Sequence, residues 1–332
     1  MSRALPASVL VTGASGFLGR HVCIELIRRG VAVRGLVRRP EAALAPGVVA
    51  QRARGLDDRE ALRKAVQGVE GVVHLAARVH QVPGADDEAA HRTVNLDGTR
   101  NLLDAAAGAN VQSFVFFSSV KVMGESSDAP WTERDVPRPA GVYGATKLAA
   151  EAAVREAAEL HRMHAPVLRL PLVYGPGMTA NALKLFQGAE RGTPLPLGAV
   201  RNNRSFLFTG NLVAALVAVL AHEAGDDVFF VSDGQDLSTP ELIEAIARAL
   251  GRPARLVPVP MGVLRAAGRF GDLVARVVPF PLTTPAVDRL AGSLAVDITK
   301  LRRQAEYSPP YSVAEGLRVT AEWYRARSKD GA

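Results

Sequence analysis

Tyr143 and Lys147 have the types and spacing of an acid/base site. They stand four residues apart in the stretch YGATK at the start of an expected helix, so both side chains lie on one helix face. An ammonium beside a phenol favours the phenolate and lowers the tyrosine pKa from about 10 towards the range of a general acid/base. Alone the spacing is a weak signal, because Tyr143 could be a packing residue and Lys147 a solvated one.

A serine pair supports the catalytic interpretation. The run SFVFFSS ends with Ser118 and Ser119 and is typical of a parallel strand, and open α/β sheets bind ligands at the carboxyl ends of such strands. A hydroxyl there can hydrogen-bond a substrate carbonyl or alcohol and hold it against the tyrosine. Together the serine, tyrosine and lysine predict a proton-transfer site.

The stretch VTGASGFLGR (11–20) sets Gly13, Gly16 and Gly19 between an apolar strand and a helix. In that context the three glycines serve a tight turn, close backbone approach to a pyrophosphate and helix–strand packing. The helix N-terminus then offers unpaired N–H groups to the phosphates. The pattern predicts a dinucleotide site rather than an ordinary loop.

The end of the second expected strand bears on which dinucleotide is bound. An NAD site usually has Asp or Glu there, on the ribose 2′-hydroxyl, but no acid occurs between Ala32 and Pro40. Arg38 could instead bind a 2′-phosphate through charge-assisted hydrogen bonds. Arg38 and Arg39 could also be solvated surface residues, so the sequence favours NADP(H) and leaves NAD(H) possible.

The elements that must position these residues alternate between strand and helix. Strands are expected at 8–11, 31–37, 69–77, 113–119 and 166–176, with helices ending at Arg29 and spanning 56–68, 95–109 and 144–160. Such alternation predicts an α/β, Rossmann-like doubly wound parallel sheet. A Gly/Pro-rich stretch follows Gly175, and then a helix at 212–221, a strand at 228–233 and a helix at 239–250. We therefore predict a dinucleotide-binding domain of 1–174 and 206–233, with an interleaved C-terminal substrate region of 175–205 and 234–325.

Composition excludes several classes of protein. The chain has 332 residues, 48% of them hydrophobic, and a formal net charge of +7. Its basic residues are scattered without a long run, which argues against nucleic-acid binding. Cys23 is the one cysteine, so neither an intramolecular disulfide nor a multi-cysteine metal site is possible, and we expect it to be a small buried side chain. The most apolar helix, 212–221, is too short to cross a bilayer, so we expect a cytoplasmic protein without membrane insertion or a metal.

Six motifs, in this order, resemble the extended short-chain dehydrogenase/reductase family of the NAD-dependent epimerase/dehydratase type. They are TGASGFLG, HLAA (74–77), NLDGT (95–99), FSSVKVMG (117–124), YGATK (143–147) and LRLPLVYGPG (168–177), and they cover nearly the whole chain. The resemblance implies a Rossmann-like fold, bound NAD(P) and a catalytic triad of Ser119, Tyr143 and Lys147. Counting back from Gly124, Ser119 rather than Ser118 holds the catalytic position. The implied cofactor-binding residues are Gly13, Ser15, Gly16, Phe17, Leu18, Arg38, Leu75, Ala76, Ala77, Asn95, Tyr143 and Lys147, with Asn95 also supporting the active-site helix.

The stretches SSVKVMGE, PLPLGAVRNNRS and VSDGQDLSTPELI resemble a bacterial subgroup that acts on sugar nucleotides for surface polysaccharide. Its members are similar to UDP-glucose 4-epimerase and include reductases of 4-keto-6-deoxy-N-acetylhexosamines. The implied substrate is a UDP-sugar, and the main candidate substrate-binding residues are Asn181 and Arg204. Further candidates are Lys121, Arg201 and Arg289, and for each of these three a solvent-facing side chain is the alternative.

Three departures from the subgroup concern binding rather than chemistry. Val37 stands where an acid is expected. Arg54-Gly55-Leu56 replaces Gly-Asp-Leu, so the carboxylate for the adenine amine is missing unless Asp57 serves. Leu172 replaces an asparagine that would donate to the diphosphate. The missing acid favours a reductase with exchangeable NADPH.

In the implied reaction a hydride passes between nicotinamide C4 and sugar C4 while Tyr143 exchanges a proton with the sugar oxygen. Ser119 orients that oxygen, and Lys147 lowers the tyrosine pKa and holds the nicotinamide ribose. The leading prediction is 4-keto reduction of a UDP-hexose or UDP-N-acetylhexosamine for O-antigen or capsule precursors. The alternatives are a UDP-sugar 4-epimerase with tightly bound NAD, a dehydrogenase of a non-sugar alcohol, and a dinucleotide-sensing protein. The family resemblance also predicts a homodimer through the helices near 98–108 and 145–160.

Overall fold

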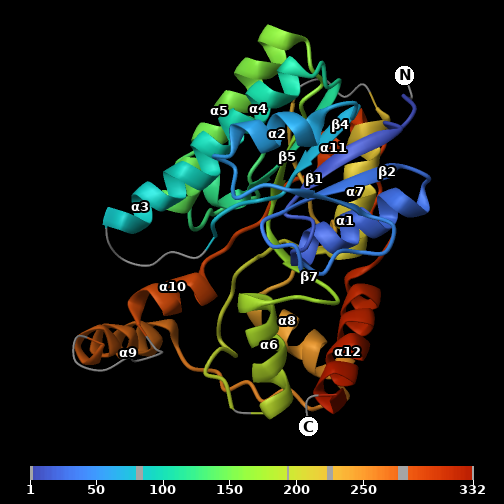
Figure 1. The fold of residues 1–332 in the computed structure, drawn as a ribbon. Coiled ribbons are helices and arrows are strands. Elements are labelled where there is room, and N and C mark those ends of the chain that lie inside the picture. Colours follow the sequence, from blue (N-terminus) through green and yellow to red (C-terminus); the bar gives the residue numbers. More distant parts are fainter. Residues whose placement is uncertain (1–2, 80–84, 193, 223–226, 276–282, 331–332) are drawn as a thin grey trace.

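The computed structural model describes residues 3–79, 85–192, 194–222, 227–275 and 283–330, arranged as two lobes (Figure 1). The upper lobe in that view holds a seven-stranded sheet in the order β3-β2-β1-β4-β5-β6-β9. Every neighbouring pair in the sheet is parallel. The strands are β1 (Ser8–Thr12), β2 (Ala32–Val37), β3 (Val49–Arg52), β4 (Gly71–His74), β5 (Ser113–Ser119), β6 (Val167–Leu170) and β9 (Val228–Phe230). The predicted Rossmann-like fold is confirmed.

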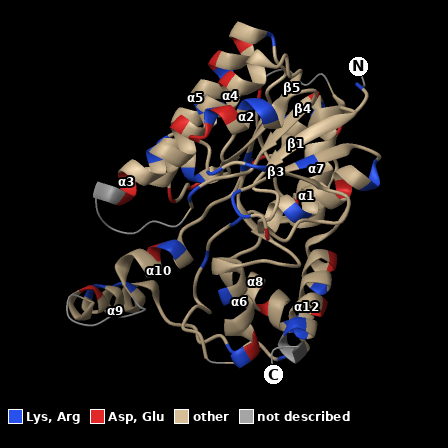
Figure 2. Ribbon diagram, in the orientation of Figure 1, with Lys and Arg blue, Asp and Glu red and all other residues tan. Residues whose placement is uncertain are grey.

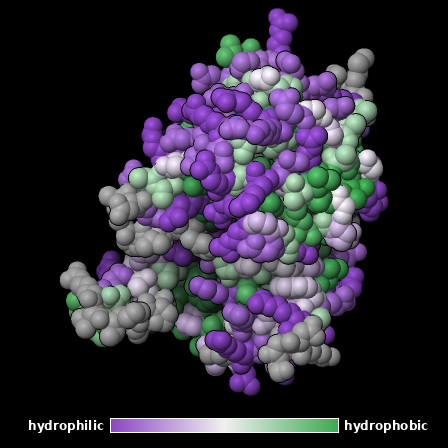
Figure 3. Space-filling view, in the orientation of Figure 1, coloured by the Kyte–Doolittle hydropathy of each residue, from purple (hydrophilic) through white to green (hydrophobic). Residues whose placement is uncertain are grey.

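Helices cover both faces of this sheet because its strands are apolar on both sides. Val9 and Val11 of β1 enter a core shared with α1 (Phe17–Arg28) and α7 (Thr209–Ala221), whereas Leu10 enters the core on the other face. That second layer consists of α2 (Arg59–Val66), α4 (Gly98–Gly108) and α5 (Val142–His161). Hydrophilic residues dominate the outer surface of this layer (Figure 3).

The lower lobe is built around a second, two-stranded parallel sheet of β7 (Leu172–Tyr174) and β8 (Phe206–Phe208). Its helices are α6 (Ala180–Arg191), α8 (Thr239–Ala249) and α12 (Val313–Asp330), which share one apolar core. An arm formed by α9 (Met261–Val274) and α10 (Thr284–Ala291) projects from this lobe (Figure 1). The remaining elements are α3 (Ala85–Arg92), the π-helical turn η1 (Thr93–Asp97), the short helix η2 (Val120–Val122) and α11 (Thr299–Gln304).

One expected strand is wrong. Residues 166–176 do not form a single strand but two, β6 and β7, in different sheets. Pro171 lies between them, and because proline has no N–H it cannot continue a hydrogen-bonded ladder. The strands expected at 69–77 and 228–233 also end earlier, at His74 and Phe230. The domain boundaries stay a prediction. They assign both β7 and β8 to the dinucleotide-binding domain, and these two strands pair with each other in the lower lobe.

The sheet order brings the predicted site residues to one edge. The direction of chain progression reverses between β1 and β4, which are neighbours, so the turns that follow them lie side by side at the carboxyl ends of the strands. Such a switch point is where open α/β sheets bind ligands. The glycine turn (13–19) and the stretch 75–77 therefore face the same crevice.

A buried ion pair joins α5 to the sheet. Arg169 of β6 donates to Glu151 of α5 through Nη2 at 2.7 Å and through Nε at 3.1 Å. The Ser118 hydroxyl of β5 donates to the same carboxylate. Arg169 and Glu151 are both buried, so each charge depends on the other for compensation.

Replacing Arg169 with methionine tests this contact. Arg169→Met should lower the free energy of unfolding by about 3–5 kcal/mol, because the Glu151 carboxylate is left buried without its partner. Arg28→Ala breaks a pair with Glu25 in which the arginine is exposed, and it should cost far less, because solvent screens that pair. Denaturant unfolding measures both; equal losses in the two variants would contradict the assignment.

Candidate active site

The turn between β1 and α1 can be made only by glycine at two of its positions. Gly13 has φ +69°, a conformation that favours glycine. A Cβ on Gly19 would lie 2.1 Å from the Gly13 carbonyl oxygen, so any side chain there would break the turn. The glycine pattern therefore has the structural basis that the sequence predicted.

The start of α1 fits a pyrophosphate. Gly16 is the N-cap, and no side chain among the described residues caps this helix. The first intrahelical bond runs from the Arg20 N–H to the Gly16 carbonyl, so the N–H groups of Phe17 and Leu18 have no partner within the helix. Unpaired N–H groups at the positive end of a helix dipole bind phosphate oxygens. Phe17, Leu18 and the exposed Ser15 are thus suited to hold the cofactor's phosphates, whereas the Gly16 N–H already donates to the Gly13 carbonyl at 2.9 Å.

A buried hydrogen-bond chain fixes the stretch after β4, which forms a wall beside the glycine turn. Thr99 donates its hydroxyl to the Asn95 carbonyl (2.7 Å), so it must accept from Nε2 of His74 (2.9 Å). Nδ1 of His74 then accepts from the Thr12 hydroxyl (2.6 Å), whose oxygen accepts from the Ala76 N–H (3.1 Å). Burial lowers the pKa of His74 to about 3, so this imidazole is neutral. The chain positions Ala76 beside Gly13.

Asn95 connects that wall to the active-site helix. Its Oδ1 accepts from the Arg78 N–H (2.7 Å), and its Nδ2 donates to the Arg78 carbonyl (3.0 Å) and to the Thr146 hydroxyl of α5 (3.2 Å). Asn95 lies in the π-helical turn η1, an insertion that occurs frequently at functional sites. The sequence pattern gave no signal for this turn.

Ser119 and Tyr143 meet at the end of β5. Burial raises the pKa of Tyr143, and a side-chain hydrogen bond with Ser119 partly offsets this by lowering it. The Ser119 oxygen also accepts the Lys121 N–H at 3.2 Å. Ser118 is buried and donates to Glu151 instead. Of the two serines, the structure therefore brings Ser119 to the tyrosine, in agreement with the position that the motif gives it.

Lys147 is buried below the tyrosine on α5. Its Nζ donates to the Phe117 carbonyl at 2.6 Å and lies 3.8 Å from the centre of the Phe116 ring. Burial lowers the pKa of Lys147 to about 7, opposed by the charge of Glu151. The expectation that Lys147 lowers the Tyr143 pKa is not met in this structure. The amine donates to a backbone carbonyl, and burial disfavours its charged form.

His91 contacts the tyrosine and was missed in the sequence. Its ring centre lies 6.4 Å from that of Tyr143, and its Nε2 lies 3.7 Å from Oδ2 of Asp87. Arg78 pairs with the same carboxylate at 2.8 Å. His91 is fully buried, and neither ring nitrogen has a hydrogen-bond partner among the described residues. The i,i+4 spacing of Asp87 and His91 was the one available signal.

The edge of the sheet where β2 and β3 end is basic. Arg38 follows β2 directly, is exposed and has no partner among the described residues. Arg52 ends β3 and lies opposite Val37 in the parallel register, so both arginines stand at the same edge of the sheet. Asp58 accepts from the Ala61 N–H and pairs with Arg54, whereas Asp57 is exposed. Basic and acidic residues elsewhere are spread over both lobes (Figure 2).

The predicted substrate residues are only partly brought together. Arg204 donates to the Arg289 and Gly292 carbonyls, each at 2.8 Å, and so holds the end of α10. Asn181 is exposed in the first turn of α6, and Arg201 is exposed. Lys121 forms an ion pair with Glu125. Leu172 packs against the core of the lower lobe.

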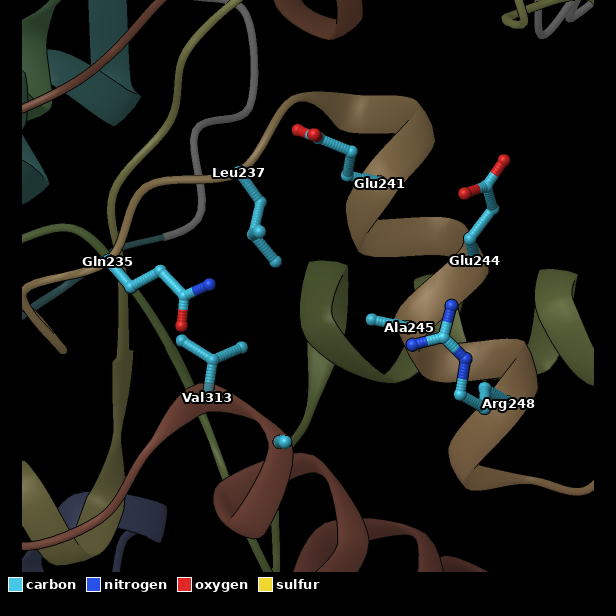
Figure 4. Close-up of a pocket in the computed structure, with 8 residues that line it drawn as sticks. Gln235, Leu237, Glu241, Glu244, Ala245, Arg248 and Val313 are labelled. Carbon is cyan, nitrogen blue, oxygen red and sulfur yellow. The ribbon is translucent and has the colours of Figure 1, made fainter.

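A pocket between α8 and the start of α12 is lined by none of these residues, although Leu237 in its lining pairs with the backbone of Arg204 (Figure 4). Its lining consists of Gln235, Leu237, Glu241, Glu244, Ala245, Arg248, Val313 and Ala314. Glu241 belongs to a capping box with Ser238 at the start of α8, which gives this carboxylate a structural role.

The described residues offer no cluster of three or more His, Cys, Asp or Glu side chains that could hold a metal ion. Within that same part of the chain, no helix has both the length and the apolar character needed to span a membrane. Cys23 is buried, and burial raises its pKa to about 12, so the predicted buried side chain is confirmed.

The fold and this site define an NAD(P)-dependent enzyme of the short-chain dehydrogenase/reductase type. Residues 9–231 match the NAD dependent epimerase/dehydratase family, and the chain belongs to that family. The chain is 33% identical over 331 residues to UDP-glucose 4-epimerase of Vibrio cholerae, covering 96% of each chain. It is 28% identical over 342 residues to 3 beta-hydroxysteroid dehydrogenase/Delta 5-->4-isomerase of Mycobacterium tuberculosis, covering 95% and 90%. Its structure resembles that of Thermus thermophilus UDP-glucose 4-epimerase in complex with NAD, with a TM-score of 0.76 and 25% identity over 96% and 99% of the chains.

The burial of Lys147 predicts a pH dependence of stability. Below about pH 7 this lysine is charged in both the folded and the unfolded chain, so folding must bury the charge. Between about pH 7 and 10 only the unfolded chain keeps the proton, so the free energy of unfolding rises with pH, by up to about 1.4 kcal/mol per pH unit. The unfolding free energy of the wild type minus that of Lys147→Met should therefore become more positive as the pH rises through this range. A difference that stays flat, or that falls as the pH rises, would contradict the lowered pKa.

Proposed function

We propose that this enzyme reduces the 4-keto group of a UDP-hexose or UDP-N-acetylhexosamine with exchangeable NADPH, to supply O-antigen or capsule precursors. The sugar-nucleotide part is supported by the similarity to UDP-glucose 4-epimerase of Vibrio cholerae over almost the full length. The reductive part rests on one observation: Arg38 follows β2 and Arg52 ends β3, at the edge where an NAD site usually has an acid.

In the proposed reaction, the chain's own residues handle the proton. The bound nicotinamide supplies the hydride. Tyr143 donates its phenolic proton to the sugar oxygen. Ser119, which is already hydrogen-bonded to Tyr143, orients that sugar oxygen. Lys147, with a pKa near 7, is suited to return a proton to the tyrosine near neutral pH and to hold the nicotinamide ribose. Gly13, Leu75, Ala76, Ala77 and Asn95 shape the crevice that excludes water.

The second candidate is UDP-sugar 4-epimerisation with retained NAD, which the Vibrio cholerae relative and the NAD-bound Thermus thermophilus structure favour. Oxidation of a non-sugar alcohol is a third, in view of the hydroxysteroid dehydrogenase of Mycobacterium tuberculosis. A purely dinucleotide-sensing protein would not need Ser119, Tyr143 and Lys147 gathered at one helix and one strand end. A homodimer through α4 and α5, and roles for Lys121, Asn181, Arg201, Arg204 and Arg289 in substrate binding, belong to the same proposal.

Removing the phenolic proton tests the role of Tyr143. Tyr143→Phe should lower kcat by about 10²–10⁴-fold and leave NADPH affinity near that of the wild type. Turnover is measured with a UDP-4-keto-6-deoxy-N-acetylhexosamine by loss of NADPH absorbance, and affinity by fluorescence titration. Tyr311→Phe makes the same chemical change at a partly exposed residue and should retain full activity. Activity of Tyr143→Phe at the level of this control would refute the assignment.

Substitution of Arg38 tests the cofactor proposal. Arg38→Ser should weaken NADPH binding about 10- to 100-fold, the loss of a charge-assisted hydrogen bond of roughly 1.5–3 kcal/mol, and leave NADH binding unchanged. Arg63→Ser removes an exposed charge from α2 and should change neither affinity. Equal effects on NADPH and NADH would mean that Arg38 does not contact a 2′-phosphate.

A further inference from the structure

The helix α9 presents two apolar faces. Leu264, Gly268 and Gly271, spaced by four and three residues, are buried on one of them. Leu264 packs in a small core with Val200 and Val287 of α10, and a Cβ on Gly268 would lie 3.1 Å from the Thr284 backbone, so this face is firmly seated.

The opposite face of α9 is apolar and exposed. Val263, Phe270 and Leu273 have exposed fractions of 56%, 65% and 58%, and Ala266 lies exposed among them. At about 100° per residue, these four positions share one stripe that faces away from Leu264 and Gly268. We call Val263, Ala266, Phe270 and Leu273 the outer face of α9. Large apolar side chains gathered on one exposed stripe mark an interaction surface.

The edge of the outer face is cationic. Arg265 and Arg269, one helical turn apart, are exposed along one side of it, and neither pairs with any described residue. The one acid of α9, Asp272, is half-buried and accepts from the Thr284 N–H at 3.0 Å. Arg252 and Arg255 are exposed in the segment before the helix. The surface thus combines apolar side chains with unpaired positive charge.

The outer face also lies where a flat surface can reach it. In Figure 1, α9 is at the outer end of the projecting arm, with α10 between it and the rest of the molecule. An amphipathic helix with bulky apolar residues on one side and arginines beside them lies in the interface of a membrane, where the arginines bind anionic headgroups. At 14 residues, α9 is too short to cross the bilayer.

We propose that the outer face of α9 docks this enzyme on the surface of an anionic membrane, with the helix lying in the plane of the headgroups. The net charge of +7 adds long-range attraction to such a surface. This inference does not depend on which sugar, or which reaction, the active site serves.

The test is flotation of the full chain with vesicles. Wild type should float with phosphatidylcholine vesicles that contain phosphatidylglycerol, and less with phosphatidylcholine alone. Phe270→Ser/Leu273→Ser should reduce the bound fraction at least tenfold, because the apolar contacts are lost. Arg265→Gln/Arg269→Gln should lose about thirtyfold on the anionic vesicles only, which corresponds to roughly 1 kcal/mol per arginine. Leu160→Ser, at an exposed apolar residue at the end of α5, is the matched control and should float as wild type does.

Circular dichroism and turnover should be the same in all four proteins, since none of these residues lies in the candidate active site. Failure of the wild type to bind anionic vesicles would overturn the proposal. So would equal loss in Leu160→Ser. If the wild type is instead a larger oligomer in solution that Phe270→Ser/Leu273→Ser dissociates, the outer face binds a second copy and the proposal is wrong.

Discussion

The attachment of α5 to the sheet is the interaction on which the candidate site depends. Arg169 and Ser118 hold Glu151 from two adjacent strands, and Lys147, one turn earlier on the helix, donates to Phe117 of β5. These buried contacts cannot slide by a residue without leaving a charge unpaired. They set the register in which Tyr143, at the start of α5, meets Ser119, at the end of β5.

The cofactor crevice depends on a different constraint, the parallel direction of all seven strands. Because their carboxyl ends share one edge, the glycine turn after β1, the Ala76 wall after β4 and the arginines after β2 and β3 all face the same crevice. The family is NAD-dependent. Arg38 and Arg52 stand at the edge where an NAD site usually has an acid, and they connect the cofactor proposal with the reductive one.

Much of this arrangement could be predicted from the sequence, and the omissions share a physical cause. The glycine turn, the tyrosine–lysine spacing and the serine-ended strand are local patterns, and the structure forms each of them and brings Ser119 to Tyr143. Arg52 and His91 are brought to the site by tertiary packing, which no local pattern encodes, and the π-helical turn at Asn95 has no periodic signature. The effect of Lys147 on the Tyr143 pKa was misjudged because the burial that raises this pKa depends on what covers the side chain. The outer face of α9 was missed because no helix was predicted at 261–274, where Gly262, Gly268 and Gly271 weaken the helical signal.

The fate of the nicotinamide hydrogen tests the central claim most directly. The enzyme, freed of bound nucleotide, is given a UDP-4-keto-6-deoxy-N-acetylhexosamine and NADPH deuterated at C4, and the product is analysed by mass spectrometry and NMR. Reduction predicts one deuterium at C4 of each product sugar and one NADP⁺ formed for each. If the keto sugar is left unchanged, and the same enzyme supplied with NAD⁺ converts a UDP-hexose to its C4 epimer without net formation of NADH, the account is contradicted and the enzyme is an epimerase.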